Sequence, residues 1–366
     1  MRPRDRDDRS GTATRPESPP FEPHPLFRGG HLQTIAGRYL PGRRGRLFAR
    51  PFEVEVDEGD RLLVLETIPE GWDEGDPLAV LVHGLGGCAR SPYVVRVAAR
   101  LARRGIGVVR MNLRGAGAGF GLARRTYHAG KTEDVAAVVD WLARQAPGSP
   151  IALIGFSLGA NLALKLAAEA ADRPLAGLDC VLAANPPLDL LACCQHIRRP
   201  ENRVYDRNFV RLLRREVVRL HARFPELGPL DLSGVESLLD FDEAYTAPRN
   251  GFDDAADYYA RSSAGPLVPR IALPGLVVHA EDDPFIPPEP FRRVAFPTRL
   301  SLELVPSGGH LGYLSRARWD GDRRWLDARL ASWLAARWGL PARRPSGPSR
   351  SQPQGGPSRH VAPHPQ

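Results

Sequence analysis

The chain has 366 residues, of which 42% are hydrophobic, and a formal net charge of +8. This length suits one large α/β domain with an insertion, or two small domains. No run of eighteen apolar residues occurs, which excludes a conventional membrane-spanning helix. The first twenty residues contain arginines but no apolar stretch, so they do not resemble a secretory signal peptide and we expect a cytoplasmic protein.

The positive charge is uneven along the chain. Residues 341–366 carry four arginines and no acidic residue, and residues 196–223 carry nine arginines against three acidic residues. Neither segment has an aromatic-rich basic platform or a known nucleic-acid-binding motif, so we expect solvated surface charge and no nucleic-acid partner. Weak peripheral contact with an anionic membrane stays open.

The two ends of the chain differ from its middle. Residues 1–24 and 341–366 are polar and rich in proline, which predicts a disordered arm and a disordered tail around a folded domain at 25–340. The cysteines lack the spacing of a metal site or a disulfide framework, so we interpret them as structural or free thiols. They are Cys88, Cys180, Cys193 and Cys194.

Within the folded domain, strands alternate with helices. The predicted strands cover residues 52–56, 61–68, 78–84, 106–112, 150–155, 178–185, 274–280 and 300–306. Helical periodicity covers residues 92–105, 132–145, 157–171 and 323–339. The alternation predicts a mostly parallel eight-stranded sheet with helices on both faces and an antiparallel pair at one edge. Functional loops should lie at the carboxyl ends of its strands.

Residues 188–265 separate two predicted strands and are too long for a simple crossover connection. An apolar stripe at helical spacing over 209–224 is interrupted by arginines. We interpret the segment as a helical cap insertion that shapes an apolar pocket, with its basic face toward solvent or an anionic surface.

The strongest local motif is the pentapeptide from Gly155 to Gly159, which has Ser157 at its centre. A strand precedes it and a helix follows it, and the tight turn between them requires small residues two positions either side of the serine. The turn would raise the Ser157 hydroxyl near a helix N-terminus, where developing negative charge is stabilised. We therefore predict that Ser157 is a nucleophile.

A serine nucleophile needs a base and an acid that orients the base. His310 follows two glycines after the last predicted strand, which makes it the candidate base. Asp283 and Asp282 follow the preceding strand and compete for the acid role. Asp283 is favoured because a proline follows it and turns the backbone, and Asp189 is an outside candidate.

Two backbone N–H groups should form an oxyanion hole. Leu158, the residue after the serine, would supply one, and Leu85 in the Gly-rich loop at 83–87 would supply the other. His83 in the same loop is interpreted as a histidine bonded to the backbone. The Gly-rich loop at 112–117 is not followed by the acidic ribose-binding residue that a dinucleotide site requires. We interpret it as a turn packed beside the loop at 83–87.

With these residues the chain resembles the YheT-like branch of the α/β-hydrolases over most of residues 25–340. The motifs are Gly30-His31-Leu32-Gln33-Thr34, HGLGG at 83–87, NLRGAG at 112–117, TYHAGKTEDV at 126–135, GFSLGAN at 155–161, AEDDPF at 280–285 and GGHLGY at 308–313. The resemblance implies the α/β-hydrolase fold and a charge-relay triad of Ser157, Asp283 and His310. Members of the branch act as medium-chain ester hydrolases, acyltransferases and phospholipases. The resemblance also draws attention to His31 and His128, which we interpret as histidines that link core elements, with a role in substrate binding as the alternative.

The residues thus predict a serine hydrolase that cleaves carboxylic esters through an acyl-enzyme, and the resemblance implies short- to medium-chain acyl or lipid-like substrates. Neither a cofactor nor a metal is expected, because no histidine–carboxylate cluster has metal spacing. An acyltransferase would use the same acyl-enzyme with an alcohol acceptor. A non-catalytic binding module is the third hypothesis, against which the complete set of catalytic residues argues.

Overall fold

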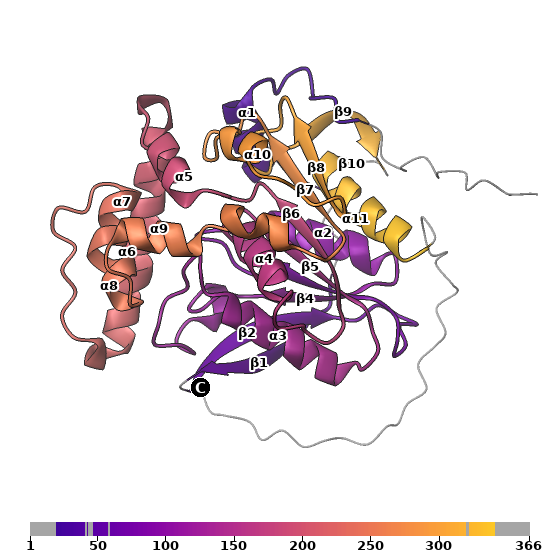
Figure 1. The fold of residues 1–366 in the computed structure, drawn as a ribbon, viewed down its shortest axis with the longest axis horizontal. Helices are drawn as coiled ribbons and strands as arrows, with labels where there is room; N and C mark the ends of the chain where they lie inside the picture. The colour runs from indigo at the N-terminus through magenta and orange to yellow at the C-terminus, as the bar shows by residue number, and fades with distance from the viewer. Residues whose placement is uncertain (1–19, 41, 43–46, 58, 320–321, 341–366) are drawn as a thin grey trace, which may run out of the picture.

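The computed structural model describes residues 20–40, 42, 47–57, 59–319 and 322–340. Its centre is an eight-stranded sheet with the strand order β1-β2-β4-β3-β5-β6-β7-β8 (Figure 1). The strands are β1 (Arg50–Asp57), β2 (Asp60–Thr67), β3 (Leu78–Val82), β4 (Gly107–Met111), β5 (Ile151–Phe156), β6 (Leu178–Ala184), β7 (Gly275–Ala280) and β8 (Leu300–Val305).

Strand directions agree with a mostly parallel sheet. Only β2 runs antiparallel to its neighbours β1 and β4, while the pairs from β4 through β8 are parallel. All eight predicted strands are present, each within two residues of its expected ends. The fold prediction is therefore confirmed.

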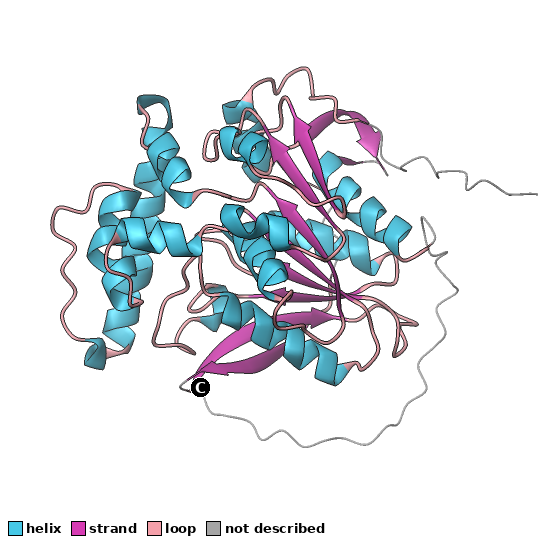
Figure 2. Cartoon of the chain, in the orientation of Figure 1, coloured by secondary structure: helices cyan, strands magenta, loops and turns pink. Residues whose placement is uncertain are grey.

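Helices cover both faces of the sheet (Figure 2). On one face α2 (Pro92–Ala102) packs with α11 (Trp325–Arg337), and on the other α3 (Thr132–Gln145) packs with α4 (Leu158–Glu169). The central strand β5 is buried along its whole length, and its successive side chains join the two cores in alternation. This explains its continuous apolar run, because a strand covered on both sides has no solvent face.

Two elements near the chain ends were not predicted. They are α1 (Gly30–Tyr39) and a small hairpin of β9 (Leu314–Trp319) and β10 (Asp322–Arg324). Residues 20–24 pack on the folded domain. The ring centroids of Phe21 and Trp325 lie 5.3 Å apart, and Pro23 forms an antiparallel β-bridge with Ser315. The expected disordered arm at 1–24 therefore extends too far toward the C-terminus, because residues 20–24 belong to the folded domain. Its remainder, 1–19, and the expected tail at 341–366 lie outside the described residues.

The chain between β6 and β7 forms a group of helices that lies beside the sheet at the left of Figure 1. We call residues 188–265 the cap. Its longest helix buries an apolar stripe of Val210, Leu213, Val217 and Leu220, and begins six residues before the predicted start at 209. The cap helices are α5 (Leu190–Ile197), α6 (Arg203–Arg223), α7 (Leu238–Phe241), α8 (Ala247–Arg249) and α9 (Ala255–Ser262). A short helix α10 (Glu289–Arg293) follows β7.

No helix in the described part of the chain has both the length and the apolar composition needed to cross a bilayer.

Candidate active site

Ser157 occupies the turn between β5 and α4 with a backbone φ of 54°. A non-glycine residue with positive φ is strained, and such strain persists where the surrounding structure enforces it. A Cβ on Gly155 would lie 2.2 Å from the Gly159 carbonyl oxygen, and one on Gly159 would lie 2.4 Å from the Val82 carbonyl oxygen. Both flanking positions therefore require glycine, and the predicted strand–turn–helix setting of the serine is confirmed.

The structure brings Ser157, His310 and Asp283 into one hydrogen-bonded chain. His310 Nε2 lies 2.9 Å from Ser157 Oγ, and His310 Nδ1 lies 2.8 Å from Asp283 Oδ2. With its proton on Nδ1, toward the carboxylate, the imidazole presents Nε2 as an acceptor for the serine hydroxyl. The arrangement can accept a proton from Ser157 and return it to a leaving group.

Asp283 is fully buried, yet it has four hydrogen-bond donors. Its Oδ1 accepts from the Phe285 and Ile286 N–H groups at 2.8 and 3.3 Å, and its Oδ2 accepts from Asn185 Nδ2 at 2.6 Å besides His310. Burial alone would raise the pKa of Asp283, but the charge and hydrogen bond of His310 outweigh it and the pKa is lowered. The carboxylate can therefore stay ionised opposite His310.

The competing acids lie elsewhere. Asp282 Oδ1 accepts a hydrogen bond from the Gly309 N–H at 2.8 Å, so it supports the loop before His310. Asp189 caps α5 by accepting from the Ala192 N–H at 2.9 Å.

Sequence reasoning missed Asn185, which follows β6 with a φ of 49°. Its amide nitrogen donates to Asp283 and to the Gly309 carbonyl oxygen at 3.3 Å, while its Oδ1 accepts from the Tyr313 hydroxyl at 2.9 Å. Asn185 therefore orients the acid. Its position at the carboxyl end of the strand beside the serine turn was the available signal.

Helix α1 holds the loop that carries His310. The Thr34 hydroxyl accepts from the His310 N–H at 2.8 Å and donates to the Gly30 carbonyl at 2.6 Å. Gln33 Nε2 donates to the Leu314 carbonyl at 3.1 Å, and its Oε1 accepts from the Leu314 N–H at 2.7 Å. The motif at residues 30–34 therefore has a structural role, because its side chains fix the backbone of the segment that carries His310.

The two histidines that the motifs singled out have different settings. His31 is exposed, and its ring stacks on that of Tyr205 in the cap with the two centroids 5.7 Å apart. His31 Nδ1 lies 3.0 Å from the Tyr205 hydroxyl oxygen. The expectation that His31 links core elements is therefore wrong, since it links α1 to the cap. His128 is buried edge-on against Phe252 and Tyr258, and burial lowers its pKa to about 4.

The loop expected to supply Leu85 lies directly against the serine, since a Cβ on Gly84 would be 2.9 Å from Ser157 Cβ. The N–H groups of Gly84 and Gly86 donate to the hydroxyls of Tyr93 and Tyr127 at 3.0 and 2.9 Å. Between them, the Leu85 N–H has no acceptor among the described residues. The Leu158 N–H opens α4 and has no partner inside that helix. Both groups are thus available to a ligand.

His83 stabilises this loop through hydrogen bonds at both of its ring nitrogens. Its Nδ1 donates to the Gly84 carbonyl at 2.8 Å, and its Nε2 accepts from the Leu113 N–H at 3.1 Å. Burial lowers the pKa of His83 to about 4, so the ring stays neutral in these bonds. The interpretation of His83 as a backbone-bonded histidine is confirmed, and so is the packing of the loop at 112–117 beside it.

Arg114 of that second loop is fully buried and forms ion pairs with Asp134 at 2.6 Å, Asp60 at 2.7 Å and Asp57 at 2.8 Å. This network joins β1, β2 and α3 behind the loop. Two of the motifs that mark the resemblance, at 112–117 and 126–135, therefore have a structural role.

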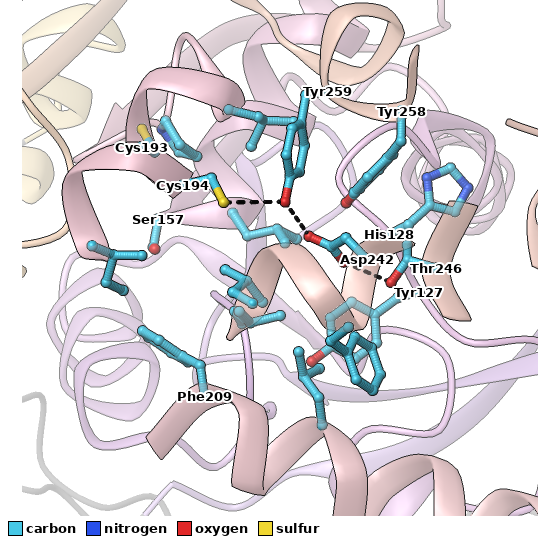
Figure 3. Close-up of a pocket in the computed structure, with 18 of the residues that line it drawn as sticks. Tyr127, His128, Ser157, Cys193, Cys194, Phe209, Asp242, Thr246, Tyr258 and Tyr259 are labelled. Atoms are coloured by element: carbon cyan, nitrogen blue, oxygen red, sulfur yellow. Dashed lines mark hydrogen bonds between the residues drawn. The ribbon is translucent and has the colours of Figure 1, made fainter. Parts of the chain in front are cut away.

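An inner cavity of about 110 Å³ extends from Ser157 beneath the cap (Figure 3). One wall is polar: the Tyr259 and Thr246 hydroxyls each donate to Asp242 at 2.7 Å. Burial raises the pKa of Asp242 to about 6 and that of Glu216, which also lines the cavity, to about 7. The remaining lining is mainly apolar and includes Leu190, Ile197, Phe209, Leu213, Val217, Phe241 and Ile286.

All four cysteines are free thiols. Cys193 and Cys194 lie in α5, and both line the inner cavity (Figure 3). The Tyr259 hydroxyl lies 3.4 Å from Cys194 Sγ. No group of three metal-ligating side chains occurs in the part of the chain that the structure describes.

A second, wider outer cavity of about 550 Å³ also reaches Ser157 and lies between α1 and α6. Phe285 and three other residues line both cavities and therefore lie at the boundary between them. The ring centroid of Phe285 lies 4.3 Å from that of His310. The three others are Leu85, Ser157 and Phe209.

Known proteins share this architecture. Residues 79–321 match the "Alpha/beta hydrolase family". The chain is 34% identical over 321 residues to "Putative esterase YheT" of Escherichia coli (strain K12), covering 86% of this chain and 92% of that protein. It is 26% identical over 273 residues to "Monoacylglycerol lipase" of Saccharomyces cerevisiae, covering 72% of this chain and 60% of that protein.

The fold is also similar to that of Est1E from Butyrivibrio proteoclasticus, with a TM-score of 0.51, 16% identity, and coverage of 79% of this chain and 99% of that one. The family match spans most of the sheet and the helices around it, and the relative from Escherichia coli is similar along nearly its whole length. The chain therefore belongs to the alpha/beta hydrolase family, in its YheT-like branch.

Proposed function

We propose that the protein is a serine hydrolase of the carboxylesterase type, with Ser157 as nucleophile, His310 as general base and acid, and Asp283 as the group that orients His310. The observation that carries this proposal is the chain of 2.9 and 2.8 Å hydrogen bonds through His310, at the point where two cavities meet. Relatives named as an esterase and a lipase agree with it.

The reaction would proceed in two halves. Ser157 Oγ bonds to the acyl carbon of the ester while its proton passes to His310 Nε2, and the Leu158 and Leu85 N–H groups donate to the oxyanion. The carbon–oxygen bond to the alcohol then breaks, and the alcohol leaves with the proton from His310. Water adds to the acyl carbon through the same base, and the carboxylic acid leaves as Ser157 regains its proton.

The inner cavity favours a short to medium acyl chain. It lies beneath the cap, is small, and is lined mainly by apolar side chains, so an aliphatic chain would exchange water for apolar contacts there. Hydrolysis rates on p-nitrophenyl esters with acyl chains of two to sixteen carbons test this. We expect a maximum in the short to medium range, whereas a rate that rises to the longest chain would contradict it.

The nucleophile is tested by labelling with a fluorophosphonate probe and by turnover. Ser157→Ala should abolish labelling and lower kcat by about a thousandfold or more. Ser301→Ala, at an exposed position of β8, is the matched control and should behave as the unmodified protein. Full activity of the Ser157→Ala variant would overturn the proposal, and failure of the probe to label Ser157 would favour the non-catalytic binding module.

An acyltransferase is the second candidate, because the outer cavity has room for an alcohol acceptor beside Ser157. The two activities differ in what removes the acyl group from the serine. The yield of free acid against new ester, measured in water with increasing amounts of a short alcohol, distinguishes them. We expect free acid to dominate when alcohol is dilute.

A further inference from the structure

The outer cavity is bounded by α6 and α1, and the α6 residues Tyr205, Phe209 and Leu212 give it an apolar row beside a polar one. From α6 it is lined by Val204, Arg207, Asn208 and Arg211, which are spaced three and four residues apart and therefore share one helix face. From α1 it is lined by Ile35 and Arg38 among others. The loop that contains Leu85 forms its inner end beside Ser157.

The two cavities carry opposite kinds of charged residue. Arginines are the charged side chains of the outer cavity, and no acidic residue occurs among the described residues that line it. The inner cavity has Glu216 and Asp242, and neither arginine nor lysine among its described lining. The outer set comprises Arg38, Arg96, Arg207 and Arg211.

Three of the four arginines have no acidic partner. Arg96 is buried and pairs with Asp327 at 2.7 Å, so its charge is compensated. Arg38, Arg207 and Arg211 are exposed and form no ion pair with any described residue, although exposed arginines elsewhere do, such as Arg261 with Asp257 at 2.9 Å. Uncompensated charges of one sign around a concave surface raise the local concentration of the opposite ion.

We infer that the outer cavity holds the alcohol part of the ester and selects an alcohol that carries an anionic group, such as a phosphate or a carboxylate. Guanidinium groups suit this task because their planar donors match the oxygens of both anions. The inference rests on the proposed function, because it assigns the acyl and alcohol parts to the two cavities that meet at Ser157. The inner cavity supports the same orientation, since its described lining offers an anion neither arginine nor lysine.

Two soluble esters with one acyl chain test the inference: the hexanoyl ester of glycerol and the hexanoyl ester of glycerol 3-phosphate. At low ionic strength we expect kcat/KM to be about tenfold higher for the phosphorylated ester, as a few partly exposed charge contacts would give. The preference should shrink as salt is added, because salt screens exposed charges.

The double variant Arg207→Gln/Arg211→Gln should bring the ratio of the two kcat/KM values close to one, and Arg38→Gln should lower it in part. Arg215→Gln is the matched control, because Arg215 is exposed on the same helix but does not line the outer cavity. It should keep the full ratio. Thermal unfolding of each variant checks that the cap stays folded.

The outcomes separate this inference from the proposed function. If the unmodified protein is labelled by the fluorophosphonate probe and hydrolyses both esters equally well, the anion preference is overturned and the hydrolase assignment stands. If neither ester is hydrolysed and Ser157 is not labelled, the hydrolase assignment itself fails.

A membrane surface is the other source of such an anion. Co-sedimentation with vesicles of phosphatidylcholine, with and without phosphatidylglycerol, provides the comparison. If the double variant loses binding to anionic vesicles but keeps the ratio on the soluble esters, the arginines bind a lipid surface and the proposed subsite is wrong. A lost ratio with unchanged vesicle binding supports the subsite.

Discussion

The hydroxyl of Thr34 accepts a hydrogen bond from the backbone N–H of His310 at 2.8 Å. The two residues are far apart in the chain, and this bond joins the helix before the first strand to the loop after the last strand of the main sheet. The position of the imidazole over Ser157 therefore depends on a residue that takes no part in the proposed proton transfers.

Replacement of Thr34 by valine keeps the side-chain shape but removes this acceptor. We expect kcat to fall about tenfold, because the loss of one hydrogen bond costs about 1 kcal/mol and loosens the loop. The Thr34→Ser variant retains the hydroxyl and should recover most of the activity. Separate measurement of kcat and KM on a p-nitrophenyl ester checks this, and an unchanged kcat in the valine variant would contradict it.

Asn185 offers a second test of the support around the acid. Asn185→Gly preserves the positive φ but removes the amide that donates to Asp283, so kcat should fall roughly 10- to 100-fold, as for a lost hydrogen bond to a charged group. KM should change little, since the amide does not line either cavity. A change confined to KM would show that Asn185 acts on substrate binding instead.

Arg114 should matter for stability. Arg114→Met leaves the carboxylates of Asp60 and Asp134 buried without their cation, which costs about 3–5 kcal/mol when a buried pair is broken. Arg61→Gln breaks an exposed pair with Glu53 and should cost less than about 1 kcal/mol. Urea unfolding of both variants measures the difference, and similar losses in the two would refute the assigned role of the network.

Gly159 tests the serine turn. A methyl group there would meet the Val82 and His83 carbonyl oxygens at 2.4 and 2.5 Å, so Gly159→Ala must displace the backbone and should destabilise the fold by about 2 kcal/mol or more. Gly119→Ala is the control, because its methyl would find only ordinary contacts of 3.5 Å or longer. The Gly119 variant should unfold within a few degrees of the unmodified protein.

Glu216 predicts a pH dependence of stability. Its pKa is raised from 4.5 to about 7 by burial, so the folded state holds this proton more tightly than the unfolded state. The resulting stabilisation is complete below pH 4.5 and is lost as the pH rises through 7. Glu216→Gln removes the titration, so its stability relative to the unmodified protein should improve by on the order of 1–3 kcal/mol between pH 4 and pH 8.

Denaturant unfolding at both pH values, with the variant compared with the unmodified protein at each, isolates Glu216 from the buried histidines. Those histidines titrate in both proteins and cancel in the difference. A constant difference between the two pH values would show that Glu216 does not change its charge in this range.

The centre of the sheet could be predicted because β3, β4, β5 and β7 are buried on both faces and read as continuous apolar runs. Helix α1 could not, because it contains glycines where the chain packs closely rather than an apolar stripe. A Cβ on Gly30 would lie 1.7 Å from the Asp282 carbonyl oxygen, and one on Gly37 would lie 2.5 Å from Gly312 Cα. Such contacts depend on the folded neighbours and leave no periodic signal.

In the candidate site, too, some residues could be predicted from the sequence and others could not. Ser157, Asp283 and His310 could be predicted because strand ends in a parallel sheet meet at one edge, and the chain offers these residue types there in order. Asn185 and Thr34 act through hydrogen bonds to residues remote in sequence, and neither residue type has a characteristic spacing to its partner. The role of Thr34 became visible only in the folded arrangement, and the signal for Asn185 was only its position at the end of a strand.

The unequal cavities that meet at Ser157 have a consequence for the order of product departure. On the proposed mechanism, the alcohol leaves first, through the wide outer cavity, while the acyl group remains in the narrow inner one. The space that the alcohol vacates is then the entrance for the next nucleophile. The residues of the outer cavity thus act twice in each turnover, first on the departing molecule and then on whichever molecule takes its place.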